Sequence, residues 1–244
     1  MPSENKRLCV FGDSHFACVK LAADAGLVAT GAVDLEFWGN IGKQFRHLTW
    51  RNGQIEPLDD FTATRFAKTN TYGRRVLTAA DFDMVLFMGC RIDIHRLFAE
   101  GMQRRADPDL RLSSGVEARW FRDFLHRLPP YHFARNFAAQ NTARIVMAPV
   151  PFDTEGFDPP PPVTDPEARR ALWDVAAREM QRDEIDLLAQ PDETVVAGCR
   201  TDPAYAVRKY RERNDRTHKN PKYGALILKR ALEMLDKTAA RKRA

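Results

Sequence analysis

The strongest constraint on the fold comes from two apolar runs that are continuous rather than alternating. One is FDMVLFMG, residues 82–89, which ends in glycine, and the other is ARIVMAPVP, residues 143–151. Continuous apolar runs of this length are typical of strands that are buried on both faces, as in a parallel sheet covered by helices. The two runs therefore predict central strands of an α/β sheet.

Shorter signals extend this prediction along the chain. Further strands are expected at residues 7–12 and 33–39, and a short fifth strand is expected in ETVVAG, residues 193–198. Helices are expected from Ser14 to Gly26, in the segment SSGVEARWFRDFLHRL, over residues 165–188, and after Asn220 and Pro221. Asn-Gly favours a tight hairpin turn, so Asn52-Gly53 predicts a β-hairpin near residues 47–57. Alternating strands and helices imply one α/β domain over residues 1–244, with insertions near 92–115 and 152–165.

Composition bounds the class of protein. The 244 residues are 44% hydrophobic and 29% charged, as in soluble globular domains. No run approaches the ~18 apolar residues of a membrane helix, and the N-terminal MPSENKRLCVFGD lacks the apolar core of a signal peptide. We therefore expect a cytoplasmic protein with no membrane insertion.

The net charge and the cysteine spacing limit which partners and cofactors are expected. The net charge of +5 permits nucleic acid or an anionic substrate, but no basic segment with interleaved aromatic residues stands out, so a nucleic-acid partner is not expected. Cys9, Cys18, Cys90 and Cys199 form no C-x-x-C pair, which favours reduced, packed thiols. No metal or organic cofactor is expected.

The segment LCVFGDSHFACVK, residues 8–20, places polar residues between a predicted strand and a predicted helix. Asp13 and Ser14 suit the cap of a helix. Ser14 could equally be a nucleophile at the carboxyl end of a strand, where open parallel sheets bind their ligands. The segments 39–42, 89–91 and 149 onward fall at the same edge, so the sequence leaves both readings of Ser14 open.

A second motif could supply the groups that a nucleophilic serine needs. A serine hydroxyl requires a base and a group that orients the base. NDRTHKNPKYG contains Asp215 and His218, three residues apart, just before the last predicted helix. A turn of this length can place both side chains on one side, although such a pair on its own is more often a surface pair.

Together, FGDSH and DRTH resemble the two catalytic blocks of the SGNH/GDSL hydrolase family. The resemblance implies a three-layer α/β/α sandwich with a flavodoxin-like, mostly parallel five-stranded sheet. It also implies ester hydrolysis or acyl transfer, often on acylated carbohydrates, lipids or small esters. By this resemblance Ser14 is the nucleophile, His218 the base and Asp215 its partner.

The two middle blocks of the family are matched less closely. Gly42, in WGNIGK, is expected to donate its backbone N–H to the oxyanion, unless it is an ordinary turn glycine. Gly89 matches the glycine of the next block, but Arg91 stands where the family has asparagine. Arg91 could replace that donor, bind an anionic part of the substrate, or form a structural salt bridge.

Two functions from different classes follow. The first is a serine esterase or acyltransferase that acts on a small-molecule or glycan ester through Ser14, His218 and Asp215. The alternative is a non-catalytic SGNH-like binding protein with a degraded oxyanion block. His15 is expected only to flank the nucleophile.

Overall fold

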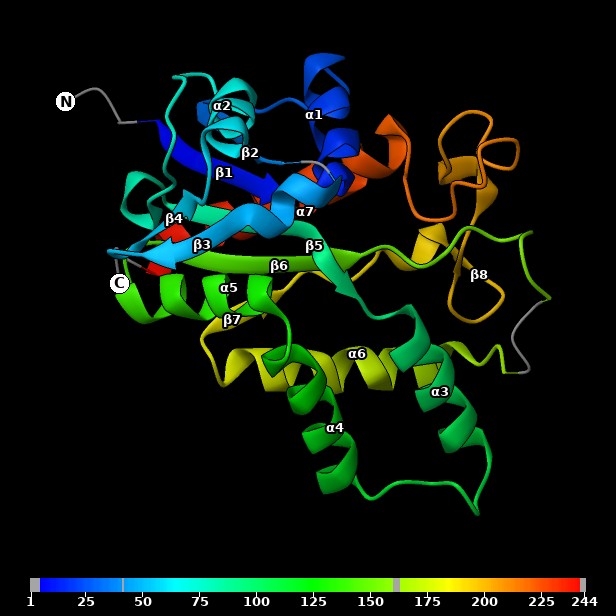
Figure 1. Cartoon of the computed structure of the whole chain (residues 1–244). Coiled ribbons are helices and arrows are strands. Elements are labelled where there is room, and N and C mark those ends of the chain that lie inside the picture. Colours follow the sequence, from blue (N-terminus) through cyan, green and yellow to red (C-terminus); the bar gives the residue numbers. More distant parts are fainter. Residues whose placement is uncertain (1–4, 41, 160–162, 242–244) are drawn as a thin grey trace.

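The computed structural model describes residues 5–40, 42–159 and 163–241, and a parallel five-stranded sheet forms its centre (Figure 1). Its strands are β1 (Lys6–Gly12), β2 (Val33–Gly39), β5 (Met84–Asp93), β6 (Arg144–Val150) and β7 (Ile185–Leu187). The order β2-β1-β5-β6-β7 is that of a flavodoxin-like sheet. The predicted fold class is therefore confirmed, and the switch point between β1 and β5 is where such sheets bind ligands.

Helices cover both faces of the sheet. They are α1 (Ala17–Asp24), α2 (Asp60–Thr69), α5 (Pro129–Gln140), α6 (Pro166–Gln181) and α7 (Pro221–Arg241). Strand β1 serves two cores because its side chains alternate: Leu8 and Val10 belong to the core under α1 and α7, and Cys9 and Phe11 to the core under α5 and α6. All four side chains are fully buried, which explains the continuous apolar pattern.

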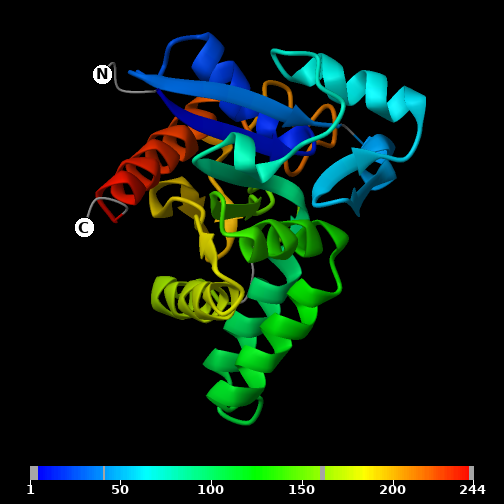
Figure 2. The same cartoon turned by 90° about the vertical axis from the view of Figure 1, so that its left-hand side faces the viewer.

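A helical pair extends beyond the sheet. Helices α3 (His95–Ala106) and α4 (Ser114–His126) project away from the strands and pack on α6 (Figure 2). Phe98 of α3 anchors this unit, with its ring centroid 4.4 Å from that of Trp173 and 5.9 Å from that of Phe121. Much of the segment expected as an insertion at 92–115 is therefore the ordered helix α3.

The fifth strand lies elsewhere than predicted. ETVVAG contributes to the short helix η4 (Asp192–Thr194) and to β8 (Val195–Val196), which pairs with β9 (Arg200–Thr201) outside the main sheet. The sheet's own fifth strand, β7, lies in the segment predicted as the end of a helix over 165–188. That prediction was wrong because the turn that ends the helix contains no glycine or proline to mark it: α6 ends at Gln181, and Glu184 takes a positive φ of 58°.

Strands β3 (Leu48–Arg51) and β4 (Gln54–Pro57) form an antiparallel hairpin. The turn is made by Asn52 and Gly53, whose φ angles are 52° and 79°. Positive φ at both central residues is what the Asn-Gly pair tolerates. The other predicted insertion, 152–165, includes residues 160–162, which lie outside the described residues.

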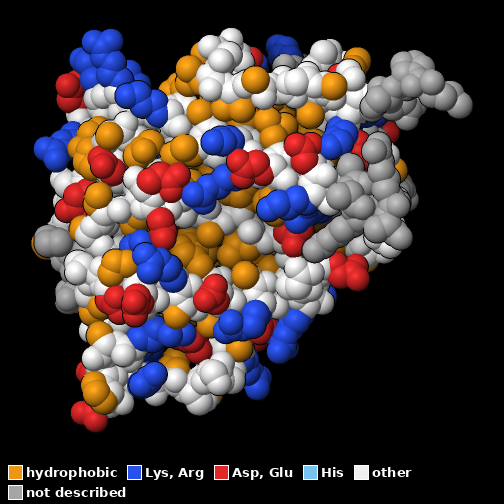
Figure 3. All heavy atoms as spheres, turned by 180° about the vertical axis from the view of Figure 1, so that it is seen from behind, with side chains coloured by type: hydrophobic (Ala, Val, Ile, Leu, Met, Phe, Trp, Pro, Cys, Tyr) orange, Lys and Arg blue, Asp and Glu red, His pale blue; other side chains and the backbone are white. Residues whose placement is uncertain are grey.

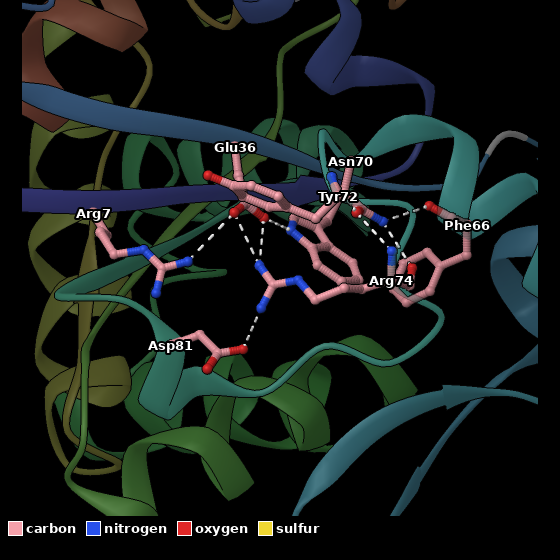
Figure 4. A network of polar contacts seen from close by, with 8 residues as sticks. Arg7, Glu36, Phe66, Asn70, Tyr72, Arg74 and Asp81 are labelled. Carbon is pink, nitrogen blue, oxygen red and sulfur yellow. Dashed lines mark hydrogen bonds and ion pairs between the residues drawn. The ribbon is translucent and has the colours of Figure 1, made fainter.

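A buried carboxylate fixes the edge of the sheet (Figure 4). Glu36 of β2 is only 4% exposed. Its oxygens accept hydrogen bonds from Arg74 at 2.8 and 2.9 Å and from Trp38 Nε1 at 2.7 Å, and Arg7 approaches to 3.4 Å. Arg74 also pairs with Asp81 at 2.6 Å. The network ties the segment after α2 to β2 and β1.

The surface carries mixed charge. On the face seen in Figure 3, positive and negative side chains are interspersed and are separated by small apolar patches. In the described part of the chain, no helix is long and apolar enough to cross a membrane.

Candidate active site

Ser14 lies two positions after the last residue of β1, at the start of the short helix η1 (Ser14–Phe16) that leads into α1. The cap of η1 is the Asp13 side chain, whose Oδ1 accepts a hydrogen bond from His15 N at 3.1 Å. The Ser14 hydroxyl instead contacts Nε2 of His218, with an Oγ–Nε2 distance of 2.7 Å. The capping alternative therefore applies to Asp13, and the Ser14 side chain is directed toward the imidazole ring of His218.

Asp215 lies on the other side of the His218 ring. Its Oδ1 is 2.8 Å from Nδ1 of His218 and also accepts the backbone N–H of His218 at 3.1 Å. Burial opposes ionisation of Asp215, but the hydrogen bonds from the His218 side chain and backbone outweigh it and hold its pKa below the usual value. An ionised Asp215 keeps the proton on Nδ1, so Nε2 is free to accept from Ser14.

The loop that carries this pair is fixed at several points. Thr154 N donates to Arg216 O at 2.7 Å, and the buried Lys219 Nζ donates to Thr154 Oγ1 at 2.9 Å. Asn220 then caps α7, because its Oδ1 accepts from the N–H groups of Lys222 and Tyr223 at 3.0 and 3.3 Å. Asn220 and Pro221 therefore take the predicted positions at the start of the last helix.

The end of β5 forms the opposite wall of the site. Gly89, Cys90 and Arg91 have φ angles of 72°, 50° and 57°, all in the left-handed region. Gly89 is needed here because a Cβ would lie 2.7 Å from His15 Cβ and 2.8 Å from Asp13 Oδ1. Cys90 is a packed thiol whose pKa is raised by burial. Consecutive left-handed non-glycine residues are strained and often occur at functional sites.

Arg91 is exposed and lines the same cavity as Ser14. Its backbone N–H donates to Asp13 Oδ2 at 3.0 Å. Among the described residues, its guanidinium has no carboxylate within ion-pair distance, so the structural salt bridge considered for Arg91 is not formed there. Gly42 is the first residue of η2 (Gly42–His47), and the role expected for its N–H stays a prediction.

Two cavities meet at Arg91. One, of about 240 Å³, is open and has mostly polar residues in its lining, which consists of Asp13, Ser14, His15, Arg91, Asp93, Val150 and Thr217. The other, of about 300 Å³, is largely apolar and is lined by Phe45, Arg46, Leu48, Arg91, Leu128, Pro129, Pro130 and Phe133. An apolar hollow beside a nucleophile can receive the hydrocarbon part of a substrate. Within the described ranges, no group of acidic, histidine or cysteine side chains could hold a metal ion.

The contacts that His15 makes in the site were underestimated from the sequence. His15, expected only to flank Ser14, pairs with Asp13 at 2.6 Å and stacks on His218 with ring centroids 5.0 Å apart. The local signal was the Asp-x-His spacing of residues 13–15, which repeats the ingredients of the D-x-x-H motif. Nothing in the sequence places that second pair against His218.

Comparison with solved structures gives matches of low sequence identity over nearly the whole chain. A Bacteroides fragilis protein provisionally named as an acylhydrolase matches over 97% of this chain and 90% of its own, with 13% identity and a TM-score of 0.43. A GDSL-like lipase from Bacteroides thetaiotaomicron covers 98% of this chain and 90% of its own, with 13% identity and a TM-score of 0.41.

A further match is a carbohydrate esterase family 2 enzyme with a carbohydrate-binding domain, from Corynascus thermopiles (Myceliophthora fergusii). It covers 98% of this chain and 68% of its own, with 12% identity and a TM-score of 0.40. No family model and no curated protein matches this chain. Its function therefore has to be argued from the geometry of the site.

Proposed function

We propose that this chain is a serine hydrolase of the SGNH/GDSL type that cleaves O-acyl esters. The observation that carries the proposal is the chain of contacts from Ser14 Oγ to His218 Nε2 at 2.7 Å and from His218 Nδ1 to Asp215 Oδ1 at 2.8 Å. Both distances lie within the range of working nucleophile–base–orienter contacts. The site stands at the carboxyl edge of the sheet beside an open cavity, where an ester can reach Ser14.

The reaction would proceed in two halves. In the first, His218 Nε2 takes the proton of Ser14 as Oγ attacks the ester carbonyl carbon, and the tetrahedral intermediate then expels the alcohol, which receives the proton from His218. In the second, His218 activates water, which releases the carboxylic acid and restores Ser14. An acceptor hydroxyl in place of water would make the same site an acyltransferase.

The charge on the tetrahedral intermediate needs hydrogen-bond donors. We assign this role to the backbone N–H groups of Ser14, the first residue of η1, and of Gly42, the first residue of η2. The family asparagine is replaced by Arg91, whose exposed guanidinium at the junction of the two cavities suits an anionic group of the substrate better than a fixed donor position.

The cavities suggest the shape of the substrate. The apolar cavity of about 300 Å³ suits the acyl chain, and the open polar cavity suits the alcohol, which could be a small molecule or an acylated carbohydrate. Arg46 and Arg91 at the apolar cavity would favour an acyl or alcohol part that carries a negative charge.

Reaction with a fluorophosphonate probe, followed by intact-mass measurement, tests the proposal directly. The wild-type protein should gain one phosphonyl group on Ser14, and Ser14→Ala should gain none. A panel of p-nitrophenyl esters with acyl chains of different length should then give turnover that Ser14→Ala abolishes. If wild type neither reacts with the probe nor hydrolyses any ester, the non-catalytic binding protein is the better reading.

A further inference from the structure

The site contains a second Asp–His pair that the proposed reaction does not use. Asp13 and His15 flank Ser14 in the sequence. The Nδ1 atom of His15 lies 2.6 Å from Asp13 Oδ1, and the same oxygen accepts the His15 backbone N–H at 3.1 Å. This pair is more buried than Asp215 and His218, because the His15 side chain is 11% exposed and the His218 side chain 38%.

The two imidazole rings are stacked face to face. Their centroids are 5.0 Å apart and their planes are inclined by 15°. The ring of His15 therefore covers one face of His218 while Asp215 holds its Nδ1 edge and Ser14 its Nε2 edge. With contacts at both edges and on one face, His218 has little freedom to rotate away from Ser14.

The surroundings hold His15 firmly in this position. Gly89 leaves the space that the His15 Cβ and ring occupy, since a Cβ on residue 89 would come within 2.7 Å of His15 Cβ. Asp13 Oδ2 accepts the backbone N–H of Arg91 at 3.0 Å, so one carboxylate links His15 to the left-handed turn at the end of β5. Asp13 is only 4% exposed.

The Nε2 atom of His15 indicates which form of the ring fits the site. This atom is buried and has no hydrogen-bond partner in the described part of the chain. A proton there would be a buried donor without an acceptor, which is costly. Burial opposes ionisation of Asp13, but hydrogen bonds from His15 and Arg91 outweigh it and hold the pKa of Asp13 below its usual value. An ionised Asp13 accepts a hydrogen bond from Nδ1–H of His15, and Nε2 carries no proton, so the His15 ring is neutral in this arrangement.

We propose that His15 is a positioning residue for His218: a neutral imidazole, anchored by Asp13, stacks on the base and favours the imidazolium that forms when Ser14 loses its proton. This inference rests on the proposed hydrolase function. A π face attracts a nearby cation, whereas a charged ring would repel it. The charged groups near the stacked pair include Asp215 at the far edge of His218, and Arg91 and Asp93 in the wall of the cavity. The buried Lys219, which follows His218 in the chain, interacts with Asp215.

Two substitutions separate this role from simple packing. His15→Asn keeps an N–H donor for Asp13 and removes the ring, whereas His15→Phe keeps a flat ring and removes the donor. His126→Phe is the matched control, because His126 also pairs with an aspartate, Asp183 at 3.0 Å, but lies at the end of α4.

Ester turnover of the three variants is measured after the folded sites have been counted by phosphonate titration. We expect His15→Asn to lower kcat roughly 10- to 100-fold, the scale of a misplaced catalytic group, with little change in KM. His15→Phe should recover part of that loss if it retains the stack, and His126→Phe should match wild type. Wild-type kcat and an unchanged pH profile in both His15 variants would overturn the proposal.

An NMR titration of the His218 ring gives a readout that does not depend on turnover. Loss of the stacked ring in His15→Asn should move the midpoint of the His218 signal to lower pH, and His126→Phe should leave it in place. If wild type proves inactive toward phosphonate and esters, the hydrolase proposal fails, and this titration still decides whether the two rings are coupled. An unmoved midpoint in both His15→Asn and His15→Phe would overturn the coupling itself.

Discussion

Ser14 Oγ lies 2.7 Å from Nε2 of His218, although 204 positions separate the two residues in the chain. The fold makes this contact by placing the end of β1 beside the loop before α7, since α1, which follows Ser14, packs directly on α7, which follows His218. The proposed nucleophile and its proposed base are therefore positioned by a helix–helix interface that begins within a few residues of each.

Asp215→Asn tests whether the third member of this arrangement orients the base. The amide can still accept the backbone N–H of His218, but it cannot hold the proton on Nδ1 as a carboxylate does. By analogy with other triads, kcat should fall by about 10⁴-fold. Ester turnover and phosphonate labelling rates measure this loss. Equal turnover in Asp215→Asn and wild type would remove Asp215 from the mechanism.

Arg91 variants test how the site departs from the SGNH/GDSL pattern that its two motifs resemble. We expect Arg91→Ala to raise KM for anionic esters and to leave kcat for neutral esters nearly unchanged, because the role proposed for the guanidinium is to bind substrate charge. Arg91→Asn should behave in the same way and remain folded, since asparagine tolerates the φ of 57° at this position. Steady-state kinetics on matched neutral and anionic esters measures both effects.

The opposite result would assign Arg91 to the oxyanion. In that case Arg91→Ala would lower kcat by roughly 10²–10³-fold for neutral and anionic esters alike, and Arg91→Asn would restore it. Lys222→Ala serves as the charge control, because this exposed lysine on the first turn of α7 contributes no side chain to either cavity.

Much of the fold could be predicted because its signals are local. The apolar runs that became β1, β5 and β6 are buried on both faces, and Asn52-Gly53 carries the positive φ angles of its turn. The fifth strand was misplaced because the turn before it, residues 182–184, contains no glycine or proline, although Glu184 takes a positive φ there. The parallel pairing of β7 with β6 at the edge of the sheet then holds residues 185–187 as a strand.

The part of the site that its two sequence motifs contain could be predicted. Ser14, Asp215 and His218 were chosen from short segments at opposite ends of the chain, and their side chains do meet. The stack of His15 on His218 and the left-handed backbone of Arg91 were not predictable, because each depends on a neighbour distant in sequence. The burial of Lys219 was not predicted either, because lysine is ordinarily exposed and nothing local in the sequence marks this one as buried.

The network around Glu36 predicts a stability effect far from the chemistry. Arg74→Met would leave the buried Glu36 carboxylate without its main partner, so the free energy of unfolding should fall by about 3 kcal/mol or more. Arg104→Met removes an exposed pair with Glu100 within α3 and should cost less than about 0.5 kcal/mol. Urea unfolding of both variants compares the two losses. Similar losses would mean that Glu36 is adequately held by Arg7 and Trp38.

Lys219 predicts how stability depends on pH. Its side chain is 4% exposed, and burial lowers its pKa from 10.5 to about 7. Between these values the unfolded chain holds a proton that the folded chain has released, so the free energy of unfolding should rise with pH. The rise should be absent in Lys219→Met and present in Lys222→Met, where the lysine replaced is exposed.

The most informative window for this comparison lies between about pH 7 and 8.5, where one fully released proton contributes about 1.4 kcal/mol per pH unit. Burial raises the pKa of Cys18 to about 12 and of Cys199 to about 11, from 9.0, so these thiols oppose the trend only at higher pH. Burial lowers the pKa of His95 from 6.5, so the titration of His95 affects the free energy of unfolding only at pH values below this window. Urea unfolding at several pH values should therefore give a difference between wild type and Lys219→Met that grows across the window. Parallel curves would show that Lys219 stays protonated in the folded protein, stabilised by Asp153 and Asp215 beyond the cost of its burial.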